Sequence, residues 1–323
     1  MNRKSVIIGL AGILALAIFF SLSNSRPAMA AFPDKPISLL VPFQAGGGTD
    51  GTARALAARL EKVLNVPVVV KNEVGSGGRR GSIALFKSQP DGYTIGFVHF
   101  ATLLYDDVFG EKKSPIDFTK FAAILKVDAA YFFIYVNKKS PFKTLGDLKN
   151  TTSPIKFGST GIGTPSWLVP EAFRAELGFP ITFVAGYKSL AEAALAVARG
   201  DVDAAVGTYT HIQGVLDDLR PLVYVSDQKA FKLPDVPTIV EAGYPRLAVL
   251  DVPWMIAAPP GTPEKELELL RAALSKIVNS EEFSTWAKDA GYSPVTEEPA
   301  DFWKKMQMKK EIYENLKSRM QAK

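Results

Sequence analysis

The chain has 323 residues, 47% of them hydrophobic and 22% charged, a composition typical of a globular protein with about two domains. It contains no cysteine, which excludes disulfides, thiolate metal sites and a cysteine nucleophile, and its two histidines are too few for a histidine-rich metal centre. The formal net charge is +5, but Lys and Arg form no run of the nucleic-acid-binding type, so we expect no nucleic-acid partner.

Residues 1–30 have the layout of a secretory signal peptide. Arg3 and Lys4 form a positive region, an apolar stretch covers 6–20, and residues 28–30 (AMA) offer a small-x-small cleavage site. The apolar stretch is short for a membrane-spanning helix, which needs about 20 residues. We therefore expect a cleaved leader and a periplasmic protein, with an uncleaved N-terminal anchor as the alternative.

The first part of the mature chain alternates strand-like and helix-like segments. Apolar strand segments are predicted at 36–43, 66–73 and 93–100, with helical periodicity at 52–64 and 82–89 between them. This β–α–β–α–β order predicts a parallel sheet covered by helices.

The same alternation continues in the second part of the chain. Thr144 and Asp147 have the spacing of a helix N-cap with its capping box. The other predicted elements are a strand at 131–140, a strand, glycine loop and helix start at 155–167, an alanine-rich helix ended by Gly200 and followed by a strand (190–208), a strand at 221–227, a proline-bounded connection with a short helix (234–245), a strand and rigid turn at 251–263, and two amphipathic helices at 264–279 and 302–321.

These segments predict two α/β domains, with the chain crossing between them near 128–133 and again near 250–256. Domain 1 is expected to be discontinuous and to consist of residues 31–130 plus 252–323. Domain 2 is expected to cover residues 131–251.

Glycine-rich loops follow three of the predicted strands, at 44–51, 75–81 and 158–164. Ligands of open α/β folds bind outside the carboxyl ends of the strands, and glycine lets backbone N–H groups come close to them. The helix that follows presents free N–H groups and a partial positive charge to an anion. A single such loop could simply be a tight turn, but three of them favour a site for a carboxylate or phosphate.

The first loop also matches the dinucleotide pattern G-x-G-x-x-G through Gly46, Gly48 and Gly51, and Glu73 stands where a ribose-binding acid would fall. Against a nucleotide, Asp50 would lie within the turn and repel a pyrophosphate. Asp50 can instead accept N–H groups at the start of the helix. Because no nucleophile–base set is evident either, we expect no enzyme, no cofactor and no metal.

Several motifs together resemble one family. They are "DKPISLLVPFQAGGGTDGTARALAARL", "VVVKNEVGSGGRRGS", "PDGYTIGF", "IKFGSTGIGT", "GDVDAAV", "PDVPTIVEAGYP" and "APPGTPEKELELL". In this order they resemble the solute-binding proteins of tripartite tricarboxylate transporters, the Bug family, over essentially the whole mature chain. The resemblance implies a type II periplasmic-binding-protein-like fold, with two α/β domains around a central ligand cleft.

The resemblance also implies the function. It predicts a monomeric receptor that closes on a small organic acid (a mono-, di- or aromatic carboxylate) and delivers it to membrane permease subunits. A ligand-sensing partner of a two-component receptor would use the same fold and pocket, so that alternative stays open.

The resemblance places the ligand between the loop at 43–50 and the loop at 158–164. The predicted ligand-binding residues are Phe43, Gln44, Ala45, Gly46, Gly47, Asp50, His99, Ser159, Thr160, Gly161, Gly163, Thr164, Tyr187 and Thr208. Arg79 and Arg80 are possible additional contacts, with a solvated position as the alternative, and His99 could equally be a core residue. Gly207 stands where the family often has an acid, and we interpret His211 as structural or exposed.

Overall fold

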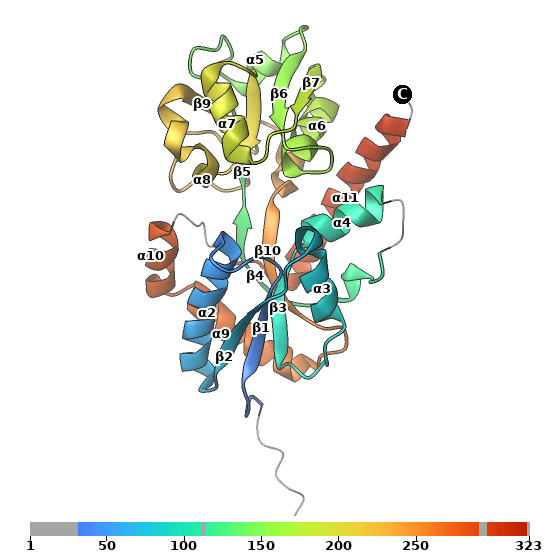
Figure 1. Ribbon diagram of the computed structural model, residues 1–323, viewed down its shortest axis with the longest axis vertical. Coiled ribbons are helices and arrows are strands. Elements are labelled where there is room, and N and C mark those ends of the chain that lie inside the picture. Colours follow the sequence, from blue (N-terminus) through green and yellow to red (C-terminus); the bar gives the residue numbers. More distant parts are fainter. Residues whose placement is uncertain (1–31, 111–113, 291–295, 322–323) are drawn as a thin grey trace, which may run out of the picture.

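The computed structural model describes residues 32–110, 114–290 and 296–321, so the predicted signal peptide lies outside the described residues. The described chain forms two halves, each built on its own five-stranded sheet (Figure 1). This confirms the predicted fold class, a mixed α/β protein with two sheets. Among these residues, no helix is both long and apolar enough to cross a membrane.

The sheet of the first half has the order β2-β1-β3-β10-β4. Its strands are β1 (Ile37–Val41), β2 (Val68–Asn72), β3 (Thr94–Val98), β4 (Ala122–Ala130) and β10 (Val252–Ala258). The first three are parallel, as their β–α–β–α–β order predicts. The other two were not placed by that argument: β10 runs antiparallel to both β3 and β4 and brings the late part of the chain back into the first half.

Helices cover both faces of this sheet (Figure 1). They are α2 (Gly48–Leu64), η1 (Ser76–Gly78), α3 (Arg79–Phe86), α4 (Phe100–Phe109), η2 (Phe118–Lys120), α9 (Glu264–Val278), α10 (Glu281–Asp289) and α11 (Pro299–Gln321). Sequence periodicity did not separate α4 from the strand before it, because both are apolar and only His99 lies between them. Helix α3 begins at Arg79, inside the glycine cluster and earlier than expected.

The sheet of the second half has the order β7-β6-β8-β5-β9. Its strands are β5 (Phe132–Asn137), β6 (Ile155–Ser159), β7 (Ile181–Ala185), β8 (Ala204–Gly207) and β9 (Leu219–Val225). The helices of this half are α5 (Leu145–Lys149), α6 (Pro165–Leu177), α7 (Leu190–Arg199), α8 (Tyr209–Ile212), η3 (Gln213–Asp218) and η4 (Pro245–Val249). The predicted capping box of Thr144 and Asp147 and the helix end at Gly200 are both confirmed.

The short helix expected within 234–245 is absent, and the segment forms turns instead. Thr238 and Glu241 do make reciprocal side-chain hydrogen bonds of the capping-box type, at 3.1 and 2.8 Å. Gly243, at a φ of +91°, then reverses the chain before a second helical turn can form. The 3₁₀ helix η4 follows at Pro245.

Two chain segments join the halves. Strand β4 passes through Tyr131 directly into β5, and the chain returns through Asp251 into β10. Helix α11 packs against α4 and β4 of the first half and against α6 and η4 of the second. The two halves are therefore connected by paired strands and by one long helix on the side of the molecule away from α8 and α10 (Figure 1).

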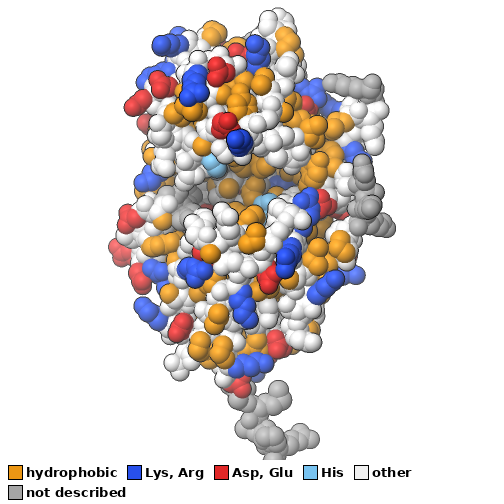
Figure 2. All heavy atoms as spheres, viewed as in Figure 1, with side chains coloured by type: hydrophobic (Ala, Val, Ile, Leu, Met, Phe, Trp, Pro, Cys, Tyr) orange, Lys and Arg blue, Asp and Glu red, His pale blue; other side chains and the backbone are white. Residues whose placement is uncertain are grey.

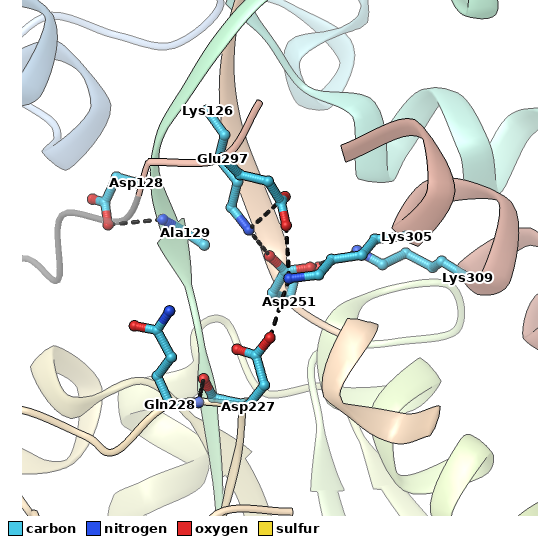
Figure 3. Close-up of polar contacts among 10 residues, drawn as sticks. Lys126, Asp128, Ala129, Asp227, Gln228, Asp251, Glu297, Lys305 and Lys309 are labelled. Atoms are coloured by element: carbon cyan, nitrogen blue, oxygen red, sulfur yellow. Dashed lines mark hydrogen bonds and ion pairs between the residues drawn. The ribbon is translucent and has the colours of Figure 1, made fainter. Parts of the chain in front are cut away.

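Six charged residues, here called the charge cluster, gather at these crossings (Figure 3). They are Lys126, Asp227, Asp251, Glu297, Lys305 and Lys309. Lys309 Nζ donates to Asp251 Oδ1 at 2.8 Å and to the Asp251 carbonyl at 2.7 Å, and Lys126 Nζ lies 2.9 Å from Asp251 Oδ2. Burial alone would raise the pKa of Asp251, but the charges of Lys309 and Lys126 lower it to about 2.

Candidate ligand-binding site

A cavity of about 340 Å³ opens between the two halves. Figure 2 shows a hollow between the halves, with apolar surface at its base and histidine side chains at its edges; of the two histidines, His211 lines this cavity. Its lining residues are Gly48, Thr49, Thr52, Asp128, Ala129, Ala130, Tyr131, Phe133, Thr208, Tyr209, Thr210, His211, Tyr224, Ala230, Phe231, Lys232 and Trp254. A cavity of this size, lined from both halves, has the dimensions of a small-molecule site.

The first half contributes the start of α2 and the crossing strands. Helix α2 begins at Gly48, inside the segment predicted as the first glycine loop, so that its first turn opens at the cavity. The N-terminal end of a 17-residue helix carries a partial positive charge and favours an anion nearby.

A β-bulge directs Asp128 into the cavity. Residues two apart on a regular strand share a face, which would place Asp128 beside Lys126. The pairing of β4 with β10 instead slips by one residue between Asp128↔Trp254 and Lys126↔Met255. Lys126 therefore enters the charge cluster, while Asp128 points away from it (Figure 3) and accepts a hydrogen bond from Ala129 N at 2.7 Å.

Aromatic side chains form much of the cavity wall. The Tyr224 ring lies 4.6 Å from the Phe133 ring and 5.7 Å from the Tyr131 ring, measured between centroids. On the side of the first half, the Trp254 ring lies 5.7 Å from the rings of Phe43 and His99. These packed rings give the cavity a rigid, mainly apolar wall.

His211 borders the cavity from α8, the short helix that follows β8. Its Nδ1 lies 3.3 Å from Thr208 N and 2.7 Å from Thr208 Oγ1, so the side chain caps its own helix. Burial lowers the pKa of His211, which keeps the ring neutral at pH 7.

Of the residues predicted from sequence, Thr208 lines this cavity. His99 and Gly163 line a smaller one, of about 50 Å³, on the other side of the crossing strands. A Cβ atom on Gly163 would collide with the Tyr105 ring of α4, so the loop after β6 packs closely against the first half at this point.

The loop at 43–47 satisfies part of its own backbone. Asp50 accepts hydrogen bonds from Gly46 N at 2.9 Å, from Arg54 at 2.8 Å and from Asn72 at 2.9 Å, and Gly47 N donates to the Gln44 carbonyl. Asp50 thus orders the loop from the first turn of α2, while the N-cap position belongs to Gly47. Gln44, Ala45 and Gly46 are exposed.

The loop at 159–164 is a network of hydroxyl groups centred on Ser166. The Ser166 hydroxyl lies 3.0 Å from that of Thr160, 2.9 Å from that of Thr164 and 3.3 Å from that of Ser159. Thr164 Oγ1 also donates to the Gly161 carbonyl at 2.7 Å. In this conformation the hydroxyls that we expected to contact a ligand hydrogen bond to one another.

His99 is held as a packed, neutral side chain. Its Nδ1 pairs with Thr102 Oγ1, and its ring lies against Phe43 and Trp254. Burial, helped by the nearby charge of Arg79, lowers the pKa of His99 to about 4.

The two arginines of the second glycine loop differ. Arg79 makes a bidentate pair with Asp106 of α4, with N–O distances of 2.5 and 2.6 Å. Arg80 is mostly exposed, and its Nε lies 3.7 Å from Glu73 Oε2. Tyr187 is half-buried and packs near Gly158. The ligand roles of all three remain predictions.

Sequence reasoning missed most of the cavity. His211, Asp128, Lys232 and Trp254 stand in no recognisable motif, and His211 was interpreted as structural or exposed. One signal was present: Tyr131 and Trp254 lie within the two segments predicted to cross between the domains, where a ligand cleft is expected.

Comparison with known proteins places the chain in a family. Residues 52–318 match the model of the tripartite tricarboxylate transporter family receptor. Protein BugT of Bordetella pertussis is 28% identical over 299 residues, which are 89% of this chain and 90% of that protein. A ligand-free solute-binding protein from Polaromonas is 25% identical with a TM-score of 0.78, covering 89% of this chain and 99% of that one.

The periplasmic binding protein BugD is 27% identical with a TM-score of 0.63, covering 89% of this chain and 98% of that one. These similarities extend over both halves and the crossing strands between them. The chain therefore belongs to the tripartite tricarboxylate transporter family of receptors, which confirms its resemblance to the Bug solute-binding proteins.

Proposed function

We propose that the protein captures a small organic carboxylate in the cavity between its halves and delivers it to the membrane subunits of a tripartite transporter. The observation that carries the proposal is a cavity of about 340 Å³ lined from both halves, with the start of α2 on one side and Lys232 on the other. A helix N-terminus and a lysine both favour an anion.

We further propose that the leader is cleaved and that the protein works in the periplasm as a monomer. The family membership supports an exported receptor, and two members of this fold, at 24% identity, hold malate and adipate. We retain the domain bounds 31–130 plus 252–323 and 131–251, because β4 ends at Ala130 and β10 begins at Val252.

Binding, without bond chemistry, is the activity that we infer. Within the described residues, no group of three or more His, Cys, Asp or Glu side chains is arranged to hold a metal ion. Of the two histidines, His99 is packed against Trp254 with its Nδ1 on Thr102, and His211 caps α8. Within the described part of the chain, the hydrogen bonds of both histidine rings go to threonines, and Ser82 accepts only the backbone N–H of His99.

Thermal-shift measurements with mono-, di- and tricarboxylates, followed by calorimetric titration of those that bind, test the proposal. A ligand that binds only the folded protein raises the unfolding midpoint by mass action. We expect at least one carboxylate to bind and NAD and ATP to give no heat of binding. Binding of NAD or ATP in place of every carboxylate would refute the proposal.

A further inference from the structure

The tautomer of His211 is determined by its neighbour. The Thr208 backbone N–H can only donate, and it lies 3.3 Å from His211 Nδ1, so Nδ1 is the acceptor. A neutral imidazole that accepts at one nitrogen carries its proton on the other. His211 therefore has an N–H donor at Nε2, on the part of the ring away from its capping contact, and its side chain borders the cavity.

A cation accompanies this donor on the same side. Lys232 is the single lysine or arginine among the described residues that line the cavity. Its Nζ lies 5.5 Å from the centre of the Phe231 ring, and Lys288 Nζ of α10 lies 5.3 Å from the same ring. Phe231 is 50% exposed, and the lysines on either side of its ring, one from each half, form a positively charged rim.

The other lining residues determine which kind of group, beside the carboxylate, the cavity favours. Six aromatic side chains reach the cavity: Tyr131, Phe133, Tyr209, Tyr224, Phe231 and Trp254. Their faces favour a flat apolar group. Asp128, buried at 5% exposure, is the one carboxylate among the described lining residues, and it would repel a second negative charge on the ligand.

We propose that this cavity takes an aromatic monocarboxylate, with its carboxylate toward His211 and Lys232 and its ring against the aromatic wall. The inference rests on the proposed function and makes it more specific, since it excludes an aliphatic di- or tricarboxylate as the preferred ligand. His211 acts as a specificity-determining residue through its Nε2 proton.

Benzoate and succinate are matched probes, one with a ring and one carboxylate, the other without a ring and with two. In calorimetric titrations of the mature protein we expect benzoate to bind at least tenfold more tightly than succinate. Tighter binding of succinate would overturn the inference and leave the proposed function in place. If no carboxylate bound at all, the proposed function would fail as well.

Two substitutions of His211 separate a ligand contact from a helix cap. His211→Asn keeps a short acceptor for Thr208 N but removes the donor at the Nε2 position, whereas His211→Gln keeps a donor at that distance. We expect His211→Asn to weaken benzoate binding tenfold to a hundredfold, with an unchanged unfolding midpoint, and His211→Gln to restore most of it.

Substitutions of two lysines, one lining the cavity and one outside it, test whether the positive charge of Lys232 attracts the carboxylate. Lys232→Met should weaken benzoate binding about tenfold or more, whereas Lys229→Met, which removes the same charge from an exposed position outside the cavity, should not. Equal benzoate affinities for the parent, His211→Asn and Lys232→Met proteins would show that the carboxylate does not lie against this side of the cavity.

Discussion

Asp50 shows how one side chain can organise a loop. Its carboxylate is 2% exposed and accepts hydrogen bonds from the loop backbone, from the helix and from β2. The hydrogen bond from Arg54 lowers the pKa of Asp50 to about 2, helped by Gly46 N and Asn72 and opposed by burial. The sequence predicted an N–H acceptor here, but it could not indicate the partners from α2 and β2.

We expect Asp50→Asn to lower the free energy of unfolding by about 1–3 kcal/mol, because a charged acceptor of several hydrogen bonds is lost. The pKa of Asp50 is lower in the folded protein than its ordinary 3.8, so its contribution is fully present above pH 3.8. It is lost as the pH falls toward about 2. In urea unfolding, the free-energy difference between the parent and Asp50→Asn proteins should be constant near neutral pH and should shrink below pH 3.8. A free-energy difference that stays the same at every pH would contradict this prediction.

Gly47 tests the role predicted for the first glycine loop. Its φ of −78° is open to any residue, and an added Cβ would only touch the Gln44 carbonyl, at 3.4 Å, so Gly47→Val should fold. If the ligand lies against this backbone, the valine should abolish measurable carboxylate binding. The control is Lys62→Ala on the exposed side of α2. If folded Gly47→Val bound the carboxylate as tightly as the parent protein, the ligand would not lie against this loop.

At the scale of elements, the charge cluster joins β4, β10 and α11 where the chain passes between the halves. Lys309 is 1% exposed and depends on Asp251 for its buried charge. We expect Asp251→Asn to destabilise the fold by about 3–5 kcal/mol, because it leaves the buried charge of Lys309 without its paired carboxylate. Asp107→Asn, which breaks the exposed ion pair between Asp107 and Lys310 of α11, should cost less than about 1 kcal/mol in urea unfolding.

If both variants lost a similar amount of unfolding free energy, burial would not be what makes the charge cluster important for stability. The comparison is direct, because Lys309 and Lys310 are neighbours on α11 and both pair with an aspartate.

The elements that the sequence predicted well are those with a local cause. Periodicity and capping placed α2, α5 and α9, the three parallel strands of the first half, and β6 and β8 of the second, but not β7. Strand β4 was not predicted, because Lys126 and Asp128 interrupt its apolar run; only the bulge and partners distant in sequence explain why both are buried. The cavity could not be predicted from local sequence patterns for the same reason, since its lining is assembled from six separate segments of the chain.

For the whole molecule, the connections limit how the halves can move. Helix α11 lies on one side of the crossing strands (Figure 1), and the cavity rim formed by Phe231 and by Lys288 of α10 lies on the other. We expect a bound carboxylate to draw the free side together, as in other two-domain receptors. Small-angle X-ray scattering should show a smaller radius of gyration with ligand and no change with ATP. An unchanged radius at saturating ligand would indicate a cavity that binds without closure.

The position of Trp254 means that the protein carries its own optical sensor. Its indole lines the cavity, whereas the other tryptophans, Trp167, Trp286 and Trp303, do not. A triple Trp→Phe variant at those three positions would emit from Trp254 alone, so that any occupant of the cavity would shift or quench its fluorescence in proportion to occupancy. The unlabelled protein could then report the concentration of its ligand in a culture medium directly, and a signal without change on saturation would show that the ligand lies away from the indole.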